Sequence, residues 1–379
     1  MSYRKNVFVL GAGFSHDAGA PLMNDFFQRA RDFKEDPKSS LTEADRKIFR
    51  RVVEYRFDLN KALAKIFVDL DNIEQLFGFL EMELQLSSLA QVGLRDDMRY
   101  LIARTLEVST EKSLPVIPYG VVTGRAGETK VSRQFRGNQY AFFSGLVSGS
   151  WNPDKLAGAD SIDSIITFNY DLVLEREMSA LRVSPNYHCG ASADYYEDAF
   201  AGSTRRVSLL KLHGSVNWVT CANCKRLYFL SPEATRVASL RDCACPKCGQ
   251  FSFSTLIVPP TWNKGIEEDF IRSVWSKALE ELMTARRLFI VGYSFPETDQ
   301  FFKYMLGLAL AQNDELWEVH IINPSEGAWE AFKRLFNPYF LERVVTYHRA
   351  YAHNFIPDIQ SLTKQEFKET NLDNNFVRS

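Results

Sequence analysis

The ten residues Asn6-Val-Phe-Val-Leu10-Gly11-Ala-Gly13-Phe-Ser15 are the most informative stretch for the architecture of this chain. Asn6–Leu10 is a short apolar run with β-branched and aromatic residues, which is typical of a buried strand. Two glycines follow at once, and apolar residues then recur with helical spacing from Phe14 to about Phe33. We predict a strand, a glycine turn and one helix here.

Strands and helices continue to alternate along the chain. The expected strands are 161–168, 207–212, 255–258, 287–291, 319–322 and 344–347, and the expected helices are 140–147, 172–181, 267–284, 298–311 and 329–336. Consecutive strand–helix–strand units form a parallel sheet with right-handed crossovers. We therefore predict an α/β fold with a Rossmann-like parallel sheet.

Three segments do not fit this alternation. Apolar residues in 41–110 recur at spacings of three and four, which predicts a helical insertion of two or three helices. Residues 115–138 contain two prolines and four glycines, and we interpret them as a loop that serves as a lid. The third segment, 216–254, holds most of the cysteines and is predicted to be a small metal-binding module.

The composition excludes several classes of protein. The chain has 379 residues, of which 45% are hydrophobic and 24% charged, so it is neither disordered nor a coiled coil. Lys and Arg total 45 against 47 Asp and Glu, which excludes a strongly basic nucleic-acid binder. No run approaches the roughly 18 apolar residues of a membrane helix, and the apolar start is too short for a signal peptide. We expect a soluble, cytoplasmic protein without membrane contact or direct nucleic-acid binding.

Small or polar residues follow five of the predicted strands at the point where each strand ends. In an open parallel sheet, ligands bind outside these carboxyl ends, so the pattern is that of a binding site. The five segments are Gly11-Ala-Gly13-Phe-Ser15, Thr167-Phe-Asn169-Tyr-Asp171, His213-Gly214-Ser215, Gly292-Tyr-Ser294 and Asn323-Pro324.

The glycine turn suits a pyrophosphate group, because glycines let the backbone approach an anion and the next helix offers its N–H groups. The turn departs from the G-x-G-x-x-G pattern, since His16 stands at the sixth position and the next glycine is Gly19. A tight strand–helix turn that binds nothing is the alternative interpretation.

Two C-x-x-C pairs, Cys221-Ala-Asn-Cys224 and Cys245-Pro-Lys-Cys248, are separated by twenty residues. This spacing predicts a tetrahedral zinc site with four thiolate ligands and no open position, and therefore a structural zinc ion. Cys243 is an alternative to Cys245 as the third ligand. A redox-active or merely buried cysteine cluster is the alternative to a metal site.

Three further residues have both a catalytic and a structural interpretation. His213 can be a general base at the mouth of a site or a hydrogen-bonded histidine at a strand end. Asn169 and Asp171 can likewise be catalytic groups or helix-capping residues. The isolated Cys189 is interpreted as a small buried hydrophobic residue.

In this order, the segments resemble the motifs of the sirtuin superfamily. Sirtuins carry a G-A-G-x-S turn, an A-G-x-P continuation, a T-Q-N-I-D strand end, an H-G motif, two C-x-x-C zinc knuckles, a G-T-S strand end and a late asparagine. The chain matches them with the five strand-end segments, with Ala18-Gly19-Ala-Pro21 and with the two cysteine pairs, over residues 6–324.

The chain also departs from the sirtuin pattern. Phe168 replaces the glutamine of the strand-end motif, and Leu22-Met-Asn-Asp25-Phe26 stands where sirtuins have D-F-R. Val258-Pro-Pro-Thr-Trp-Asn263 replaces the F-G-E segment that helps to hold an acyl-lysine peptide. With the large helical insertion, the chain looks like the divergent prokaryotic sirtuin-like proteins of anti-phage defence, which often hydrolyse NAD+ rather than deacylate proteins.

The resemblance implies an enzyme that cleaves the nicotinamide–ribose bond of NAD+ to give ADP-ribose and nicotinamide. It implies that Asn169 orients the ribose or the attacking water, that His213 is the base and that Asp171 polarises the nicotinamide pocket. The implied cofactor-binding residues are Gly11, Ala12, Gly13, Phe14, Ser15, Pro21, Gly292, Ser294 and Asn323, and the implied Zn2+ ligands are Cys221, Cys224, Cys245 and Cys248.

Two other functions fit the same resemblance. One is an NAD-dependent protein deacylase or ADP-ribosyltransferase, and the other is a non-catalytic sensor of NAD+ or ADP-ribose. The resemblance further implies a regulated homo-oligomer and a HerA-type ATPase as partner. The expected organisation is a single sirtuin-like Rossmann domain over 1–379, with insertions at 41–110 and 216–254 and a flexible tail at 369–379.

Overall fold

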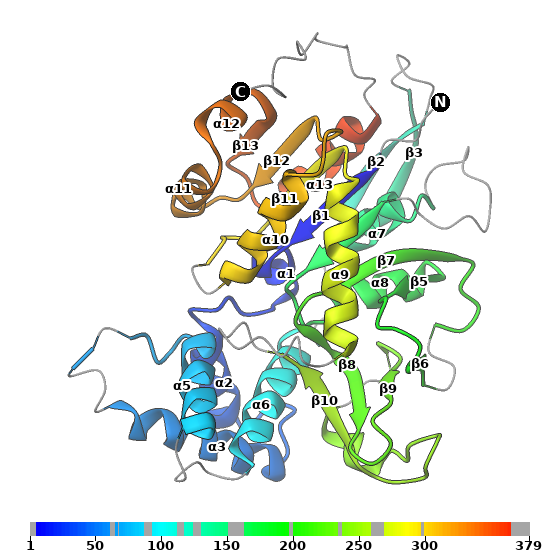
Figure 1. Cartoon of the computed structure of the whole chain (residues 1–379). Coiled ribbons are helices and arrows are strands. Elements are labelled where there is room, and N and C mark those ends of the chain that lie inside the picture. Colours follow the sequence, from blue (N-terminus) through cyan, green and yellow to red (C-terminus); the bar gives the residue numbers. More distant parts are fainter. Residues whose placement is uncertain are drawn as a thin grey trace.

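A seven-stranded parallel sheet forms the centre of the chain in the computed structural model, which describes residues 5–60, 65–66, 68–86, 93–111, 117–123, 130–150, 163–196, 200–233, 237–258, 269–296 and 299–364. The strand order is β13-β12-β11-β1-β4-β7-β5 (Figure 1). The strands are β1 (Asn6–Leu10), β4 (Ser164–Thr167), β5 (Val183–Asn186), β7 (Arg205–Lys211), β11 (Arg287–Val291), β12 (Glu318–Ile322) and β13 (Val345–His348). The predicted α/β fold with a Rossmann-like parallel sheet is confirmed.

The central strand β1 explains why its sequence is a continuous apolar run. Every residue of β1 is buried, as expected for a parallel strand that is covered on both faces. β4 pairs with one edge of β1 and β11 with the other, so the chain order of the strands reverses here. The carboxyl ends of β1 and β11 therefore form the topological switch point, where open α/β sheets bind ligands.

Helices lie on both sides of this sheet (Figure 1). Helix α9 crosses the front of the sheet in this view, while Phe143 of α7 packs edge-on against Phe8 of β1 at a centroid distance of 5.2 Å. The helices around the sheet are α7 (Gln139–Val147), α8 (Val173–Ala180), α9 (Asp269–Met283), α10 (Gln300–Leu310), α11 (Glu326–Leu335), α12 (Pro338–Val344) and α13 (Ala352–Lys364).

A second hydrophobic core lies below the main sheet in Figure 1. It joins the helices α2 (Phe26–Glu35), α3 (Glu43–Asp58), α5 (Ile73–Leu86) and α6 (Leu94–Ser109) to a four-stranded sheet of β10 (Phe253–Ile257), β8 (Gly214–Cys221), β9 (Leu227–Phe229) and β6 (Ala193–Tyr195). The helical segment and the cysteine module thus pack on each other. The organisation of 1–379 as one domain with two insertions stays a prediction.

The prediction of one helix from Phe14 to Phe33 is wrong. The chain forms the short helix α1 (Ala12–Ser15) and the 3-10 turn η1 (His16–Ala18), and α2 begins only at Phe26. Gly19 ends the turn with a left-handed φ of +94°, and Pro21 cannot donate a helical hydrogen bond. Apolar spacing alone did not reveal this break.

The prediction of a loop at 115–138 is also wrong for the described part of that segment. Strand β2 (Ile117–Thr123) pairs antiparallel with β3 (Lys130–Gly137) to form a two-stranded sheet. The prolines and glycines that suggested a loop are compatible with a small two-stranded sheet, because such a sheet consists of edges only.

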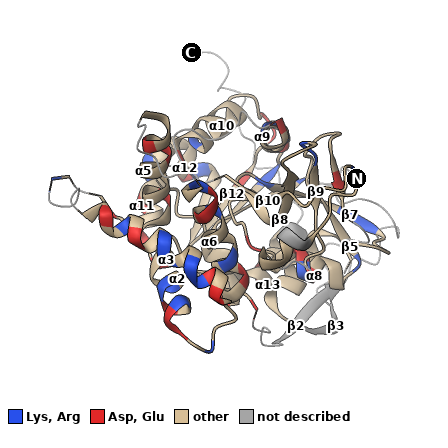
Figure 2. Cartoon of the chain, turned by 90° about the horizontal axis from the view of Figure 1, so that it is seen from below, with Lys and Arg blue, Asp and Glu red and all other residues tan. Residues whose placement is uncertain are grey.

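The remaining elements, the C-terminal tail and the surface charges complete the description of the fold. The sequence analysis did not predict β5, β6, β8, β9, α12 or α13. The expected tail at 369–379 lies outside the described residues. No helix in the described part of the chain is long and apolar enough to cross a membrane. Figure 2 shows Lys and Arg mixed with Asp and Glu along α2, α3 and α6 rather than gathered by sign.

Candidate active site at the strand ends

The five strand-end segments meet at one edge of the main sheet. The N–H of Phe168 donates to Leu10 O at 3.1 Å, and the N–H of Leu212 donates to Thr167 O at 3.0 Å. The Phe168 ring also stacks on Tyr293, with a centroid distance of 4.3 Å and an interplanar angle of 5°. Segments that are far apart in the sequence therefore form one contiguous surface.

This surface lies where the two hydrophobic cores meet. Phe168 and Leu212 belong to the core of the main sheet, whereas Leu172 and Val216 belong to the second core. The N–H of Val216 donates to Tyr170 O at 3.0 Å, which links the segments 168–172 and 212–216 where they pass from one core to the other. Junctions between packed units are preferred places for ligand sites.

The glycine turn packs directly against the end of β11. Gly13 donates its N–H to Gly292 O at 2.9 Å. Gly292 has a φ of +64°, and a Cβ atom there would lie 2.3 Å from the nitrogen of Phe14. A Cβ atom on Gly11 would lie 2.5 Å from Tyr293 Cα. Close packing alone accounts for these glycines, and pyrophosphate binding stays a prediction.

The other residues predicted around the turn differ in their access to a ligand. Phe14 is 1% exposed and its ring packs against Tyr140 and Phe143, so only its main chain can face a cofactor. Ser15 and Pro21 are buried, Ala12 is half-buried and Ser294 is exposed.

Asn169 connects the end of β4 to the glycine turn. Its Nδ2 donates to Gly11 O at 2.9 Å and to Ser15 Oγ at 3.0 Å. Because a carbonyl oxygen can only accept, the contact with Gly11 defines which end of the amide is nitrogen. No hydrogen bond to Asn169 Oδ1 forms within the described residues, and the side chain is half-buried.

Asp171 has a structural role in addition to its predicted one. Its Oδ1 accepts a hydrogen bond from the N–H of Val173 at 3.1 Å, at the start of α8. The bond steadies the first turn of α8, although the N-cap position itself is Leu172. The carboxylate is 6% exposed, and the predicted contact with nicotinamide remains a prediction.

A buried lysine holds the segment that carries Asn169 and Asp171. The Lys211 ammonium donates to Asp171 O at 2.6 Å and to Glu175 Oε1 at 2.7 Å. Both charged side chains are 2% exposed. Burial raises the pKa of Glu175, and the neighbouring Lys211 partly offsets that rise. In the sequence, Lys211 is the only charged residue of the predicted strand 207–212, and this position alone does not reveal its partners.

His213 lies in an aromatic enclosure beside a carboxylate. Its Nε2 is 3.9 Å from Asp299 Oδ1, and the two side chains are 4% and 2% exposed. The rings of Phe168 and Trp275 lie 5.3 Å and 6.4 Å from the imidazole. Asp299 was not predicted as a site residue, because it follows its strand by eight residues and has the sequence appearance of a helix cap.

Asn323 joins the ends of β11 and β12. Its Nδ2 donates to Tyr293 O at 3.0 Å, and its Oδ1 accepts from the N–H of Ser325 at 2.9 Å. The side chain is buried. Each polar atom makes one hydrogen bond here, and an amide has a second N–H and a second oxygen lone pair, so the predicted contact with adenosine remains a prediction.

The four predicted zinc ligands form one cluster. The sulfur atoms of Cys221, Cys224, Cys245 and Cys248 all lie within 4.8 Å of one another. Two of the Sγ–Sγ distances are 3.6 Å, close to the roughly 3.8 Å expected for thiolates about 2.3 Å from a tetrahedral zinc ion. Cys243 stands outside the group and donates to Ser239 O, so Cys245 is the third member. This group could hold a zinc ion.

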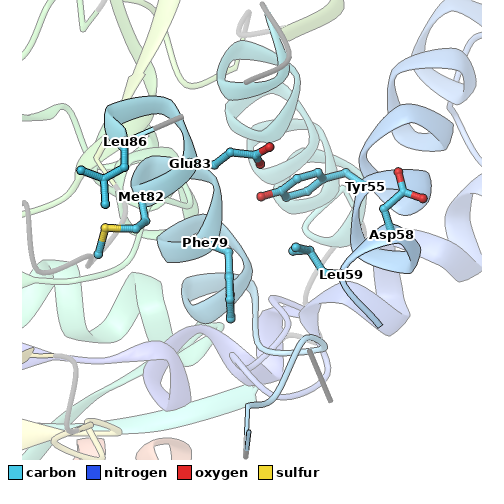
Figure 3. A pocket seen from close by; sticks show the side chains of 7 residues that line it. All are labelled: Tyr55, Asp58, Leu59, Phe79, Met82, Glu83 and Leu86. Atoms are coloured by element: carbon cyan, nitrogen blue, oxygen red, sulfur yellow. The ribbon is translucent and has the colours of Figure 1, made fainter. Parts of the chain in front are cut away.

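A separate cavity of about 490 Å³ lies between α3 and α5 (Figure 3). Its walls are Tyr55, Asp58, Leu59, Phe79, Met82, Glu83 and Leu86. None of the predicted site residues lines it. The converging strand ends are therefore the candidate active site, because they combine a switch point with several polar side chains.

The sheet defines an open α/β protein, and the candidate site lies at its switch point. Residues 163–341 match the family model of the SIR2-like domain. This part of the chain is therefore similar to the SIR2-like domain. A search of curated proteins gives no match.

Solved sirtuin structures resemble the chain only loosely. A Sir2 homologue mutant bound to ADP-ribose is 14% identical, with coverage of 96% of this chain and 93% of that one and a TM-score of 0.44. A structure from work on the mechanism and regulation of Sir2 enzymes is 15% identical, with coverage of 96% and 93% and a TM-score of 0.40. Sir2 bound to an acetylated peptide is 14% identical, with coverage of 95% and 94% and a TM-score of 0.38. At these values the likenesses carry no argument about activity.

Proposed function

We propose that the protein is an NAD+ hydrolase. Water would replace nicotinamide at C1′ of the adjoining ribose, and the products would be ADP-ribose, nicotinamide and one proton. The observation that supports this most directly is the position of the Asn169 amide, which lies against the glycine turn and whose oxygen accepts no hydrogen bond from the described residues.

The hydrogen bonds of Asn169 suit the handling of a hydroxyl group or a water molecule. Both hydrogens of Nδ2 are used by Gly11 and Ser15, so the nitrogen is held in place. Only the acceptor Oδ1 is left for a ligand. An acceptor at this position would orient a ribose hydroxyl or the attacking water towards C1′, where positive charge develops as the bond to nicotinamide breaks.

His213 would take the proton from that water or from a ribose hydroxyl. The imidazole lies against Phe168 and Tyr170, the two neighbours of Asn169 in the chain. Water forms its bond to C1′ while the bond from C1′ to nicotinamide breaks, and nicotinamide leaves as a neutral molecule. The released proton needs a base, and an imidazole is suited to this near neutral pH.

The remaining strand ends would hold the rest of NAD+. The pyrophosphate would lie along the glycine turn and the adenosine beside the ends of β11 and β12. The residues that we propose for these contacts are Gly11, Ala12, Gly13, Phe14, Ser15, Pro21, Gly292, Ser294 and Asn323. Asp171 would line the nicotinamide end in addition to steadying the first turn of α8.

The cysteine cluster would hold a structural zinc ion rather than a catalytic one. Four thiolates complete a tetrahedral shell and leave no position for a substrate. We also propose that hydrolysis is regulated in an oligomer, with a HerA-type ATPase as partner, and serves anti-phage defence in the cytoplasm. These last proposals rest on the sirtuin-like sequence motifs.

The test is an incubation of the purified chain with NAD+, followed by chromatography of nicotinamide and ADP-ribose. Equal release of both products is expected, and Asn169→Ala and His213→Ala should each lower the rate by roughly 10²–10⁴-fold. Asn337→Ala is the matched control, because Asn337 caps α12 and belongs to none of the strand-end segments. Undiminished turnover in both site variants would refute the assigned roles.

The same experiment separates the alternatives. A deacylase would release nicotinamide only with an acyl-lysine peptide present, and an ADP-ribosyltransferase would attach the ADP-ribosyl group to protein. A sensor would bind ADP-ribose in a titration but consume no NAD+ in any oligomeric form.

A further inference from the structure

Asp299 stands at the start of a helix, but its side chain does not cap that helix. It occupies the N-cap position of α10, where an aspartate side chain normally accepts a hydrogen bond from the first turn. Its carboxylate makes no such bond. The side chain instead points towards Tyr293, which follows β11, and towards His213, which follows β7.

The carboxylate is held by a hydrogen bond from a tyrosine. The hydroxyl of Tyr293 donates to Asp299 Oδ2 at 2.7 Å. Burial, and then the charge of Asp299, raise the pKa of Tyr293 well above its usual value, so this hydroxyl stays protonated and remains a donor. One carboxylate oxygen is thereby fixed, and the other lies 3.9 Å from His213 Nε2.

Burying the Asp299 carboxylate and the His213 imidazole together is energetically unfavourable unless they interact favourably. Asp299 and His213 are 2% and 3% exposed, and a buried carboxylate is stable only with compensating partners. The distance of 3.9 Å is too long for a hydrogen bond but is within the range where a negative charge stabilises an imidazolium. The aromatic rings of Phe168 and Trp275 exclude water from the pair and strengthen this effect.

We propose that Asp299 is a positioning residue for His213, which it orients and whose protonated form it stabilises, while Tyr293 holds Asp299 in place. This inference rests on the proposed NAD+ hydrolysis, in which His213 accepts the proton. Asp299 touches neither the water nor NAD+ in this scheme and acts only through the imidazole.

Other ionisable groups face the same enclosure. The ring of Tyr170 lies 6.0 Å from the imidazole, and its hydroxyl donates to Val258 O at 3.1 Å. Glu74 of α5 contributes negative charge to the surroundings of both Tyr170 and Tyr293. The charge of Glu74 is therefore present in both the wild type and an Asp299 variant. A difference between their His213 midpoints reports on Asp299 alone.

The experiment is an NMR titration of the imidazoles in the full chain, labelled at histidine and free of NAD+. The His213 signal is assigned by its loss in His213→Asn. In Asp299→Asn, the midpoint of the His213 titration should fall by roughly one to three pH units, because a neutral amide no longer favours the imidazolium. In Tyr293→Phe the carboxylate keeps its charge but loses its anchor, and a smaller fall is expected.

The control is Asp17→Asn. Asp17 lies 2.6 Å from Nδ1 of His353, so this variant should leave the His213 midpoint unchanged. An unaltered His213 midpoint in Asp299→Asn would overturn the proposal. If that variant does not fold, an unaltered midpoint in Tyr293→Phe would overturn it.

Kinetics provide the second measurement. In Asp299→Asn, the acidic limb of kcat/KM for NAD+ should move to lower pH together with the NMR midpoint, and the rate should fall. A role in folding alone would lower the amount of active protein without moving the limb. Because the titration needs no NAD+, a wild-type chain that does not hydrolyse NAD+ would refute the proposed function while the contact between Asp299 and His213 was still measured.

Discussion

The N–H of Gly13 donates to the carbonyl oxygen of Gly292 at 2.9 Å, so the turns after β1 and β11 are in direct contact across the switch point. This contact leaves no room for a side chain at Gly13 or at Gly292. The fold and the candidate binding surface therefore depend on the same few backbone atoms, and substitutions here should affect stability and ligand binding together.

Gly292→Ala should destabilise the protein by more than about 2 kcal/mol and abolish NAD+ binding. The new Cβ atom would lie 2.3 Å from Phe14 N, and the φ of +64° is unfavourable for alanine. Urea unfolding measures the first effect and a binding titration the second.

Gly307→Ala is the control for this substitution. Gly307 lies within α10, and nothing is within 4 Å of the position that its Cβ atom would take. Alanine should stabilise the helix there by about 0.5–1 kcal/mol. Equal unfolding midpoints for the two variants would contradict the close contact of the turns.

The cysteine cluster should bind one zinc ion per chain. Elemental analysis is expected to find the metal in the wild type and in Cys243→Ser, because Cys243 lies outside the cluster. Cys248→Ser should lose zinc and expose the second hydrophobic core to proteolysis, since Cys245 and Cys221 belong to that core. Zinc retention in Cys248→Ser would rule out the four-thiolate site.

Lys211→Met should cost roughly 3–5 kcal/mol of unfolding free energy, because it leaves the buried carboxylate of Glu175 without its cation. The double variant with Glu175→Gln should recover part of that loss. Lys333→Met is the control, since its pair with Glu330 is exposed and worth less than about 1 kcal/mol. A small effect of Lys211→Met in urea unfolding would show that the pair is not needed to hold the segment of Asn169.

Acid should destabilise the protein through His348. Burial, and then the neighbouring His320, lower the pKa of His348 to about 4, below its usual value near 6.5. Between these pH values the unfolded chain binds the proton and the folded chain does not. Stability therefore falls as the pH decreases through this window, by at most roughly 1.4 kcal/mol per pH unit from this group.

His348→Gln should remove this contribution and flatten the pH dependence of urea unfolding between about pH 6.5 and pH 4. The neighbouring His320 contacts His348 at 3.1 Å through Nδ1, so its own environment changes in this variant. The control is His16→Gln, because the His16 side chain is 50% exposed. The same acid slope in His348→Gln and wild type would contradict the prediction.

The inner strands of the main sheet could be predicted well because each contains a short, mostly apolar run followed by a small or polar residue. β1 and β11 were predicted with the bounds that the structure has. Edge and insertion strands were harder. β8 begins at Gly214, immediately after His213, and its register depends on pairing with β10 rather than on a pattern of its own.

The candidate site could be predicted in part. Strand-end residues such as Asn169 and His213 were found because every parallel strand points its carboxyl end to the same edge. Asp299 and Lys211 could not be found in that way. In the sequence, Asp299 looks like a helix cap. The role of Lys211 depends on its ion pair with Glu175, which lies 36 residues away in the chain.

The sequence by itself determined the parallel α/β sheet, the polar strand ends that form the candidate site, and the four cysteines that could bind zinc. These features depend on the spacing of apolar residues and cysteines along the chain, which the sequence shows directly. Only the tertiary structure decided that α1 and α2 are separate, that Gly292 must be a glycine because Gly13 lies against it, and that Asp299 faces His213 instead of capping α10. Such features arise from contacts between distant segments, whose energies depend on packing and burial that no local pattern contains.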